Sequence, residues 1–320
     1  MSFATREKVN EKGKWVFIVN PVAGNGHGLS QVDKIREMIS RFSLEADIVF
    51  TERRGHASEL SASHAEKGYK YIIAVGGDGT FSEVATPLVS NRDVITGQIP
   101  GGTANGVNEL AGFPEKYTEK EWKIFFNADA VSMDVGVCND RSFFFTGIGI
   151  GFDVQVAENF NRAREINPGK KQNYLWIVLK TILFYKEKKM VIISDGKTSE
   201  AGCFMNTVSN GARTYAKTFL LTPGAIANDG LLDICSIKKL SVPERIKILI
   251  NVPKGKHLKD RNVHYFRTPE LYAEFPESVP YHADGEISYA QSFKLGVMPD
   301  GLNLIYNPHG NHHFNIRQEN

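Results

Sequence analysis

Three glycine-rich segments hold the residues best suited to bind phosphate. They are Asn20–Gly28 (N-P-V-A-G-N-G-H-G), Gly76–Thr80 (G-G-D-G-T) and Pro100–Asn105 (P-G-G-T-A-N), and each comes directly after an expected strand. Glycine lets the backbone approach a ligand closely, and freed backbone N–H groups bind anions. Because strand ends on one edge of a parallel sheet are where ligands bind, the three segments together predict a nucleotide cleft.

The second segment is the most specific of the three. Asp78 follows two glycines, where its carboxylate could orient a metal-bound nucleotide or a hydroxyl group. Thr80 could cap the following helix and hydrogen-bond to a ligand oxygen. An ordinary turn with a capping Asp is the alternative. The first segment is not a Walker loop, since no G-K-[ST] follows it, and by itself it is as consistent with a tight turn as with a phosphate site.

The elements that would position these segments alternate between strand and helix over the first 130 or so residues. We expect strands at Trp15–Val19, Ala46–Phe50, Tyr71–Val75 and Val94–Ile99, with helices between them, and hence a parallel sheet covered by helices. From Val131 onward, short runs with two-residue alternation indicate a mostly antiparallel sandwich or barrel, interrupted by one helix at about Gln172–Lys188. The expected fold class is therefore α/β followed by β.

Composition narrows the functional classes. The 38 basic and 36 acidic residues nearly balance, which argues against a nucleic-acid-binding protein. The three cysteines are far apart and predict neither disulfides nor a metal site. The N-terminus lacks the apolar core of a signal peptide, and the segment around Leu175–Tyr185 is too short to cross a bilayer. We expect a cytoplasmic protein, and the sequence leaves open whether it forms a homodimer.

An ordered series of motifs resembles the diacylglycerol kinase catalytic domain family, which also includes sphingosine, ceramide and bacterial lipid kinases. The resemblance rests on G-G-D-G-T-F-S-E at Gly76–Glu83 and I-P-G-G-T-A-N at Ile99–Asn105, and it covers roughly residues 14 to 306. It continues through M-D-V-G at Met133–Gly136, G-I-G-I-G-F-D at Gly147–Asp153 and the segments P-G, N-D-G and D-G-E at residues 223–224, 228–230 and 284–286. The Gly76–Thr80 loop alone is shared with NAD kinases and, in related form, with phosphofructokinases.

The resemblance implies an ATP-binding α/β domain at residues 1–133, a β-rich lipid-substrate domain at residues 134–306 and a polar tail at residues 307–320, with the active site between the two domains. It implies an ATP site lined by the following residues: Asn20, Pro21, Val22, Ala23, Gly24, Thr51, Gly76, Gly77, Asp78, Gly79, Thr80, Glu83, Thr103 and Asn105. Asp284-Gly285-Glu286 looks like the catalytic loop of the family, and we favour Glu286 as the general base, with Asp284 as second choice. A surface hairpin turn is the alternative reading of this Asp-Gly pair.

Magnesium is expected because the transferring phosphate needs charge neutralisation. Bacterial members of the family also carry a structural magnesium ion. The match implies Asp229 as its side-chain ligand, the carbonyls of Ile226 and Leu231 beside it, and Asp134 ordering the network through water. An Asn-Asp-Gly turn explains the same residues.

The leading hypothesis is an ATP- and Mg²⁺-dependent kinase that phosphorylates diacylglycerol or a related lipid alcohol. The alternatives are a soluble-substrate kinase of the NAD kinase type and a non-catalytic nucleotide-binding regulatory protein. A helix with Leu175, Trp176, Leu179, Ile182 and Leu183 on one face usually packs in a core; transient docking on a membrane surface is the alternative. The three histidines at residues 309, 312 and 313 indicate a solvated tail rather than a metal site.

Overall fold

The structure is a computed structural model that describes residues 7–8, 13–127, 129–140, 142–167, 172–194, 197–212 and 219–316. It divides into two compact units. Unit 1 comprises Met1–Val135, Ile226–Gly230 and Met298–Asn320, and unit 2 comprises Gly136–Ala225 and Leu231–Val297. Residues 1–6 and 9–12 of the N-terminus, and residues 317–320 of the expected tail, lie outside the described residues.

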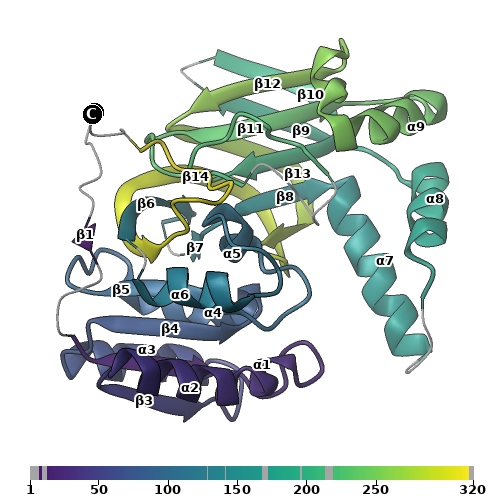
Figure 1. The fold of residues 1–320 in the computed structure, drawn as a ribbon. Coiled ribbons are helices and arrows are strands. Elements are labelled where there is room, and N and C mark those ends of the chain that lie inside the picture. The colour runs from purple at the N-terminus through teal and green to yellow at the C-terminus, as the bar shows by residue number, and fades with distance from the viewer. Residues whose placement is uncertain are drawn as a thin grey trace. The chain divides into compact units, whose positions relative to one another are not determined.

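Unit 1 alternates strands with helices (Figure 1). Its strands are β1 (Glu7–Lys8), β2 (Trp15–Val19), β3 (Ala46–Phe50), β4 (Tyr71–Gly76) and β5 (Ile95–Pro100). Its helices are α1 (His27–Ser30), α2 (Val32–Phe42), α3 (His56–Glu66), α4 (Asp78–Ala85), α5 (Gly106–Leu110) and α6 (Glu119–Asn127), with a 3₁₀ turn at Thr86–Leu88. The strands expected at Trp15–Val19 and Ala46–Phe50 are confirmed to the residue.

Strands β2 to β5 lie in the order β3-β2-β4-β5, and each neighbouring pair is parallel. Every residue of β2, β4 and β5 is buried, because helices cover the sheet and leave no solvent face. Aromatic side chains fill one side of this core: Trp15 stacks on Tyr71 with 4.2 Å between ring centroids and on Phe126 of α6 with 5.5 Å. The sheet therefore holds the loops at its strand ends on a rigid base.

The C-terminal segment is part of unit 1. His313 and Phe314 are only 3% and 6% exposed, whereas His309 is exposed. The backbone of His313 donates to Leu110 O (3.0 Å) and accepts from Ala227 N (2.8 Å). The segment therefore differs from the solvated tail that its polar composition suggests, because Phe314 supplies an apolar anchor and the backbone finds partners in the rest of the unit.

Two strands, β6 (Asp129–Cys138) and β14 (Glu286–Ile305), contribute residues to both units. In unit 1 the last part of β14 pairs in parallel with β5, at Asn303 and Leu304. The sequence pattern favours two strands separated by a turn at Asp300-Gly301; instead the chain continues through one long strand, in which Asp300 adopts a φ of +53°.

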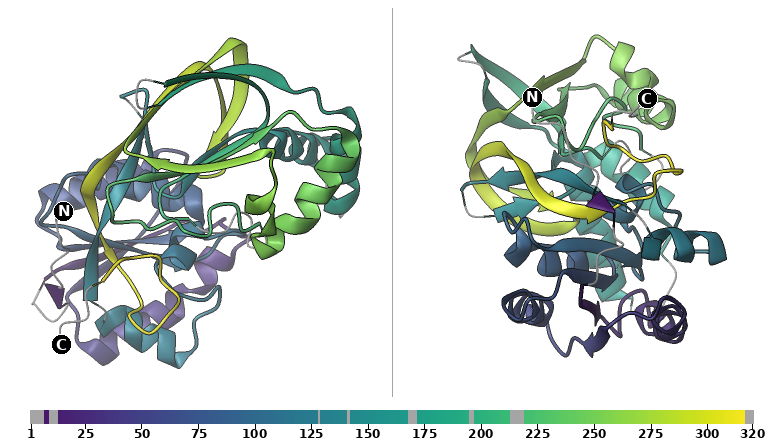
Figure 2. Two further views of the ribbon diagram at one scale, coloured as in Figure 1. Left: turned by 90° about the horizontal axis from the view of Figure 1, so that it is seen from above. Right: turned by 60° about the vertical axis from the view of Figure 1, so that its left-hand side comes forward.

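Unit 2 is mostly antiparallel, and its elements are drawn from teal to yellow in Figures 1 and 2. Its remaining strands are β7 (Ser142–Phe144), β8 (Gly147–Gly151), β9 (Lys188–Ser194), β10 (Lys197–Ser209), β11 (Leu232–Lys238), β12 (Val263–Thr268) and β13 (Glu270–Ala283). They pair in the order β12-β11-β10-β8-β13-β14. The shorter β9 also lies between the long strands β10 and β13, which it pairs with at residues that β8 does not reach.

Where the sequence led us to expect one helix, the described residues of unit 2 form three: α7 (Phe152–Ile166), α8 (Tyr174–Phe184) and α9 (Val242–Asn251). Two 3₁₀ turns, Val252–Lys254 and Lys256–Lys259, follow α9. Helix α8 packs on both α7 and α9 (Figure 1). A buried ion pair between Arg245 and Glu187 (2.6 Å), together with a bond from Arg245 to Ile182 O (2.6 Å), ties the end of α8 to α9. The three helices form one layer against the sheet.

Candidate functional site

The three glycine-rich loops follow β2, β4 and β5, neighbouring parallel strands of unit 1, and therefore meet at one edge of the sheet. Backbone hydrogen bonds connect them to one another. Asn20 N donates to Val75 O (2.9 Å), and Gly101 N donates to Gly76 O (3.0 Å). Thr51, which follows β3, is tied to the same edge because its N–H donates to Val19 O (2.9 Å).

Glycines allow these loops to touch backbone to backbone. A Cβ on Gly102 would overlap Gly77 Cα, and one on Gly101 would lie 3.0 Å from both Gly28 Cα and Gly76 Cα. Gly24 has a φ of +56°, and a Cβ there would overlap the carbonyl oxygen of Gly101. Part of the glycine content therefore serves loop packing, in addition to whatever access it gives a ligand.

Asn20 and Thr80 are joined across the first two loops. Asn20 Nδ2 donates to Thr80 Oγ1 at 3.1 Å, while Asn20 Oδ1 accepts from Val22 N at 3.2 Å. Thr80 is buried. The N-cap position of α4 is occupied by Gly77, which has no side chain to cap the helix. The prediction that Thr80 caps this helix is therefore wrong: its hydroxyl is held by Asn20 and its side chain lies against Gly76.

Asp78 is the first residue of α4, and its Oδ1 accepts a 2.6 Å hydrogen bond from Gly106 N, at the start of α5. In the third loop the side chain of Asn105 closes the loop on itself, because it both accepts from Gly102 N and donates to Gly102 O at 2.9 Å. The Asp78 carboxylate is thus held by the start of α5, which directly follows the third loop, as well as by its place in α4.

Other residues that we expected at the nucleotide site divide into two groups. Glu83 caps helix α3, since its carboxylate accepts from Gly55 N (2.9 Å) and Ala57 N (3.3 Å). Solvent reaches the side chains or backbone of the remaining positions: Val22, Gly24 and Thr103 are exposed, and Pro21, Ala23, Gly77 and Gly79 are half-buried. The exposed rim of the loops therefore consists of small and glycine residues that leave room for a ligand.

Asp134 braces the segment Ile226–Gly230. Its Oδ2 accepts from Gly230 N (2.7 Å), its Oδ1 accepts from Asp300 N (3.0 Å), and its own N–H donates to Ala227 O (2.8 Å). The side chain is 2% exposed, and this burial raises the pKa of the Asp134 carboxyl, although the two backbone N–H groups oppose the shift. Asn228 and Asn315 hold the other side of the segment through two hydrogen bonds.

The residues around this braced segment can be tested for their fit to a cation. Asp229 is half-buried, and the described residues contain no group of three His, Cys, Asp or Glu side chains that could hold a metal ion. Magnesium is commonly bound by one or two carboxylates and keeps several waters. A single Asp229 carboxylate with neighbouring backbone carbonyls therefore fits a water-rich magnesium site and does not fit a transition-metal site.

In unit 2 the segment Asp284-Gly285 forms the two-residue turn of the β13–β14 hairpin, with φ values of +47° and +88°. The Asp284 side chain folds back and accepts four hydrogen bonds: from Phe145 N (2.7 Å), Thr146 N (2.8 Å), Thr146 Oγ1 (2.6 Å) and Gly147 N (3.2 Å). Glu286 begins β14 and is exposed. The hairpin reading is therefore correct for the backbone, and the two carboxylates have different surroundings.

Two further residues of unit 2, which sequence reasoning did not single out, form a buried pair. His282 Nε2 lies 3.2 Å from Asp153 Oδ2, and their side chains are 3% and 8% exposed. The pair crosses β8 at Gly149, where a Cβ would overlap both polar atoms. The motif G-I-G-I-G-F-D contains Gly149 and Asp153, so it was the available signal for this pair.

None of the described helices is long and apolar enough to cross a membrane. The three cysteines are buried and free. Burial raises the pKa of the Cys138 thiol to about 11 and that of Cys235 to about 12, which makes both poor nucleophiles. The cysteines are therefore poor candidates for nucleophilic chemistry.

Comparison with known proteins identifies the family to which the chain is similar. Residues 14–138 match the model of the diacylglycerol kinase catalytic domain, and residues 146–306 match that of the YegS C-terminal NAD kinase beta sandwich-like domain. The chain is 26% identical over 311 residues to a putative lipid kinase, YtlR, of Bacillus subtilis, covering 91% of this chain and 98% of that protein. It is 24% identical over 306 residues to a diacylglycerol kinase of Mycobacterium tuberculosis, covering 94% and 97%.

Solved structures show the same fold. A crystal structure of a diacylglycerol kinase from Bacillus anthracis superposes with a TM-score of 0.75 at 24% identity, covering 93% of this chain and 98% of that one.

Proposed function

Because the chain belongs to the family defined by the diacylglycerol kinase catalytic domain and the YegS C-terminal domain, we propose that it is an ATP- and Mg²⁺-dependent lipid kinase. The acceptor is the hydroxyl of diacylglycerol or a related lipid alcohol. The observation that carries the proposal is the match of both family models, in order, along nearly the whole chain.

In this proposal unit 1 is the ATP-binding domain, with the NAD kinase and phosphofructokinase-like architecture expected from sequence. The parallel pairing of β2 with β3 and β4 supports this assignment. The phosphates lie against the glycine loops, where the backbone of the loops and the Asp78 carboxylate, oriented by Gly106, can contact them or their magnesium ion. Asn20 and Thr80 keep the first two loops in register.

Unit 2 is proposed as the lipid-substrate domain, and Glu286 as the general base. The lipid hydroxyl oxygen forms a bond to the γ-phosphorus, the bond from that phosphorus to the β–γ bridging oxygen breaks, and the hydroxyl proton passes to the Glu286 carboxylate. Glu286 suits this role because it is exposed, whereas Asp284 Oδ1 already accepts three hydrogen bonds and Oδ2 accepts one. Asp284 is then a positioning residue.

The Ile226–Leu231 segment is the proposed structural magnesium site, with Asp229 as the side-chain ligand and the carbonyls of Ile226 and Leu231 beside it. A bound ion there would add rigidity and local positive charge. Asp134 supports the segment by accepting from Gly230 N and positioning Ala227. Its carboxylate is already used by two backbone N–H groups, which favours an indirect role through water over direct ligation.

We also propose transient contact with the cytoplasmic face of an anionic bilayer, through the outer face of α8. Only Ile182 of the helical face expected from sequence is buried; Leu175, Trp176, Leu179 and Leu183 are exposed, as is Phe184. Exposed lysines at positions 180, 186, 188 and 189 border them. Apolar side chains next to lysines are the combination that binds anionic lipid surfaces.

The experiment that tests the proposed function is incubation of the protein with labelled ATP, Mg²⁺, a panel of lipid alcohols and NAD. Label in the lipid fraction, dependent on Mg²⁺, supports the proposal. Label found only in NAD would replace it with a soluble-substrate kinase.

A further inference from the structure

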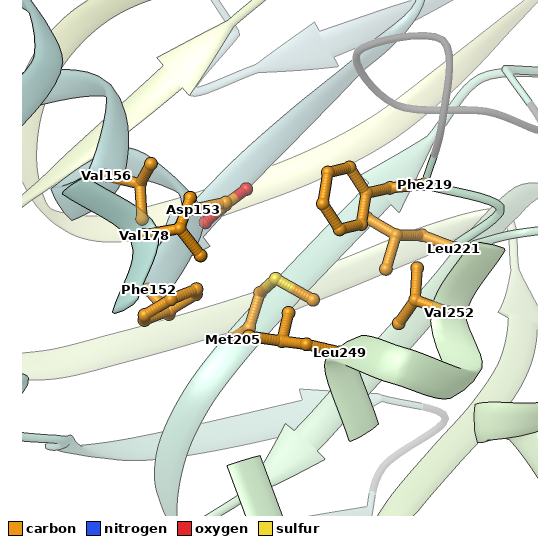
Figure 3. Close-up of a pocket in the computed structure, with 9 residues that line it drawn as sticks. All are labelled: Phe152, Asp153, Val156, Val178, Met205, Phe219, Leu221, Leu249 and Val252. Atoms are coloured by element: carbon orange, nitrogen blue, oxygen red, sulfur yellow. The ribbon is translucent and has the colours of Figure 1, made fainter. Parts of the chain in front are cut away.

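Unit 2 contains a small apolar cavity with one charged group in its wall (Figure 3). Its volume is about 40 Å³, which is room for a few water molecules at most. Asp153 lies in the wall, and its buried Oδ1 has no hydrogen-bond partner among the described residues. Because folded proteins satisfy such an atom with water where no protein donor reaches it, this cavity suits solvent rather than an organic ligand.

The C-terminal segment of unit 1, residues 307–316, lies beyond the residues that either family model matches. We call it the strap. It follows β14 as a yellow coil in Figure 2 and contains no helix or strand. Asn307, His313 and Phe314 are nevertheless buried, and the rings of Tyr306 and Phe314 lie 5.9 Å apart between centroids. A buried segment without regular structure has to find partners elsewhere for its backbone groups.

The strap supplies those partners to the C-terminal end of α5. This helix has only five residues, so it depends on contacts with the rest of the unit, and its last carbonyls have no partner inside the helix. Leu110 O accepts from His313 N at 3.0 Å. The carbonyls of Ala111 and Gly112 both accept from Asn307, from its N–H (2.8 Å) and from its Nδ2 (3.1 Å) respectively. The strap therefore caps α5.

Glycines bring the two backbones together at this cap. Gly112 has a φ of +81°, and a Cβ there would lie 3.0 Å from His312 N. A Cβ on Gly310 would overlap the carbonyl oxygen of Gly112. Because backbone packs directly on backbone, a shift of the strap cannot be absorbed by a flexible side chain and has to move the end of α5.

The strap also holds the segment Ile226–Gly230 of unit 1. His313 O accepts from Ala227 N at 2.8 Å. Asn315 and the side chain of Asn228 exchange two further bonds: Asn315 N donates to Asn228 Oδ1 (2.8 Å), and Asn228 Nδ2 donates to Asn315 O (3.2 Å). The backbone of His313 thus connects the two partners of the strap, because its N–H bonds to α5 and its carbonyl bonds to this segment.

We propose that the strap positions Asp78 and the segment Ile226–Gly230 with respect to each other, so that a nucleotide at the glycine loops and this segment respond to one another. The link to Asp78 is α5 itself, which begins at Gly106, whose N–H donates to Asp78 Oδ1 at 2.6 Å. The inference rests on the proposed function and deepens it, since Asn307 and His313 become positioning residues for the nucleotide site.

The first test uses the wild-type chain and measures hydrogen exchange of single amides by NMR, with and without ADP at a constant Mg²⁺ concentration. ADP should slow exchange at Gly106 N and, through the strap, at His313 N and Ala227 N by about threefold or more. The reference amide is Lys70 N, which bonds to Lys14 O just before β4 begins, away from the glycine loops, and it should not change. Slowing at Gly106 N alone would overturn the proposal.

Asn307→Asp and Asn311→Asp form a matched pair of variants. Both change a carboxamide to a carboxylate within the strap. Asn307 is buried and would lose its donor to Gly112 O, whereas Asn311 is exposed. Without ADP, Asn307→Asp should lower the protection of Gly106 N about tenfold while Lys70 N keeps its protection, and it should raise the Kd of ADP by a similar factor. Asn311→Asp should change neither. Unchanged protection of Gly106 N in a folded Asn307→Asp chain, or equal effects of both variants, contradicts the proposal.

Phe314→Leu is the milder variant if Asn307→Asp does not fold. It shortens the apolar anchor of the strap and should lower the protection of Gly106 N and Ala227 N together; loss at only one of them refutes the coupling. Exchange is measured without turnover, so the two proposals fail separately. A chain that shows these exchange changes but phosphorylates no lipid would refute the proposed function alone. An active kinase whose strap amides ignore both ADP and Asn307→Asp would refute this inference alone.

Discussion

Thr146 donates two hydrogen bonds to the same oxygen of Asp284, from its backbone N–H at 2.8 Å and from its hydroxyl at 2.6 Å. With Phe145 N on the other oxygen, this clamp fixes the β13–β14 turn on the strand β8 side of unit 2. The turn is where Glu286 begins β14, so the clamp fixes the start of the strand that carries Glu286.

Glu286→Gln and Asp284→Asn should therefore fail in different ways. Glu286→Gln removes the proposed base and should lower kcat by about 10²–10⁴-fold while leaving the thermal midpoint nearly unchanged, since Glu286 is exposed. Asp284→Asn puts an NH₂ group among four donors and should cost about 1–3 kcal/mol of unfolding free energy as well as activity. Steady-state kinetics and thermal unfolding of both variants make the comparison. Full turnover in both would show that neither carboxylate is the base.

Gly102→Ala tests whether the glycine loops must touch. The added Cβ would overlap Gly77 Cα, and backbone atoms cannot yield as a flexible side chain can. We expect a loss of about 1–3 kcal/mol in stability and a raised KM for ATP, because the second and third loops are pushed apart. Gly68→Asn is the control: Gly68 has a φ of +77° and open space around it, and Asn tolerates that conformation. Unchanged stability and KM in Gly102→Ala would contradict the packing role.

Asp134 should give the stability a defined pH dependence. Its folded pKa is raised above the ordinary value of 3.8, so the folded state holds this proton more tightly than the unfolded state. The stabilisation that protonation of Asp134 gives is complete when the pH is below 3.8, and it is lost as the pH rises through the folded pKa. The unfolding free energy of wild type minus that of Asp134→Asn should therefore decrease over that window, measured by denaturant titration from about pH 3.5 upward. A constant difference would contradict the direction of the shift.

The side chains of Trp176 and Leu183 on α8 are 64% and 59% exposed. Trp176→Ser and Leu183→Ser should therefore weaken binding to anionic vesicles without destabilising the fold. Removing both should lower the partition into phosphatidylglycerol vesicles by about tenfold or more, given roughly 1.5–3 kcal/mol for each fully buried large side chain. Val22→Ser is the matched control, since Val22 is 78% exposed in unit 1 and lies outside the proposed surface. Co-sedimentation measures the effect. If Val22→Ser lost as much vesicle binding as the α8 variants, or if the α8 variants lost none, α8 would not be the membrane-contacting surface.

The strands of unit 1 were predictable because fully buried parallel strands are continuous apolar runs, as in Trp15–Val19. Helix α7 was not, since its buried residues Phe152, Val154 and Val156 are spaced two apart, which is the period of a strand. Helix α9 did carry a readable signal: the capping box that Ser241 and Glu244 form.

For the site, the residue types were visible in the sequence, and their partners were not. Asp284 is bound by Phe145, 139 residues away, and Asp78 by Gly106, 28 residues away. No periodicity or motif encodes such contacts, because they are set by how distant strands pair. The same limit hid the Asp153–His282 pair, which lies across β8 and depends on Gly149.

The most direct test of the central claim follows phosphate from γ-labelled ATP when dioctanoylglycerol and NAD are offered together with Mg²⁺. We expect label in the organic phase, as a lipid phosphate, at a rate that falls at least a hundredfold in Glu286→Gln, with none in NAD. Label in NAD alone, or lipid labelling that Glu286→Gln leaves unchanged, would contradict the account.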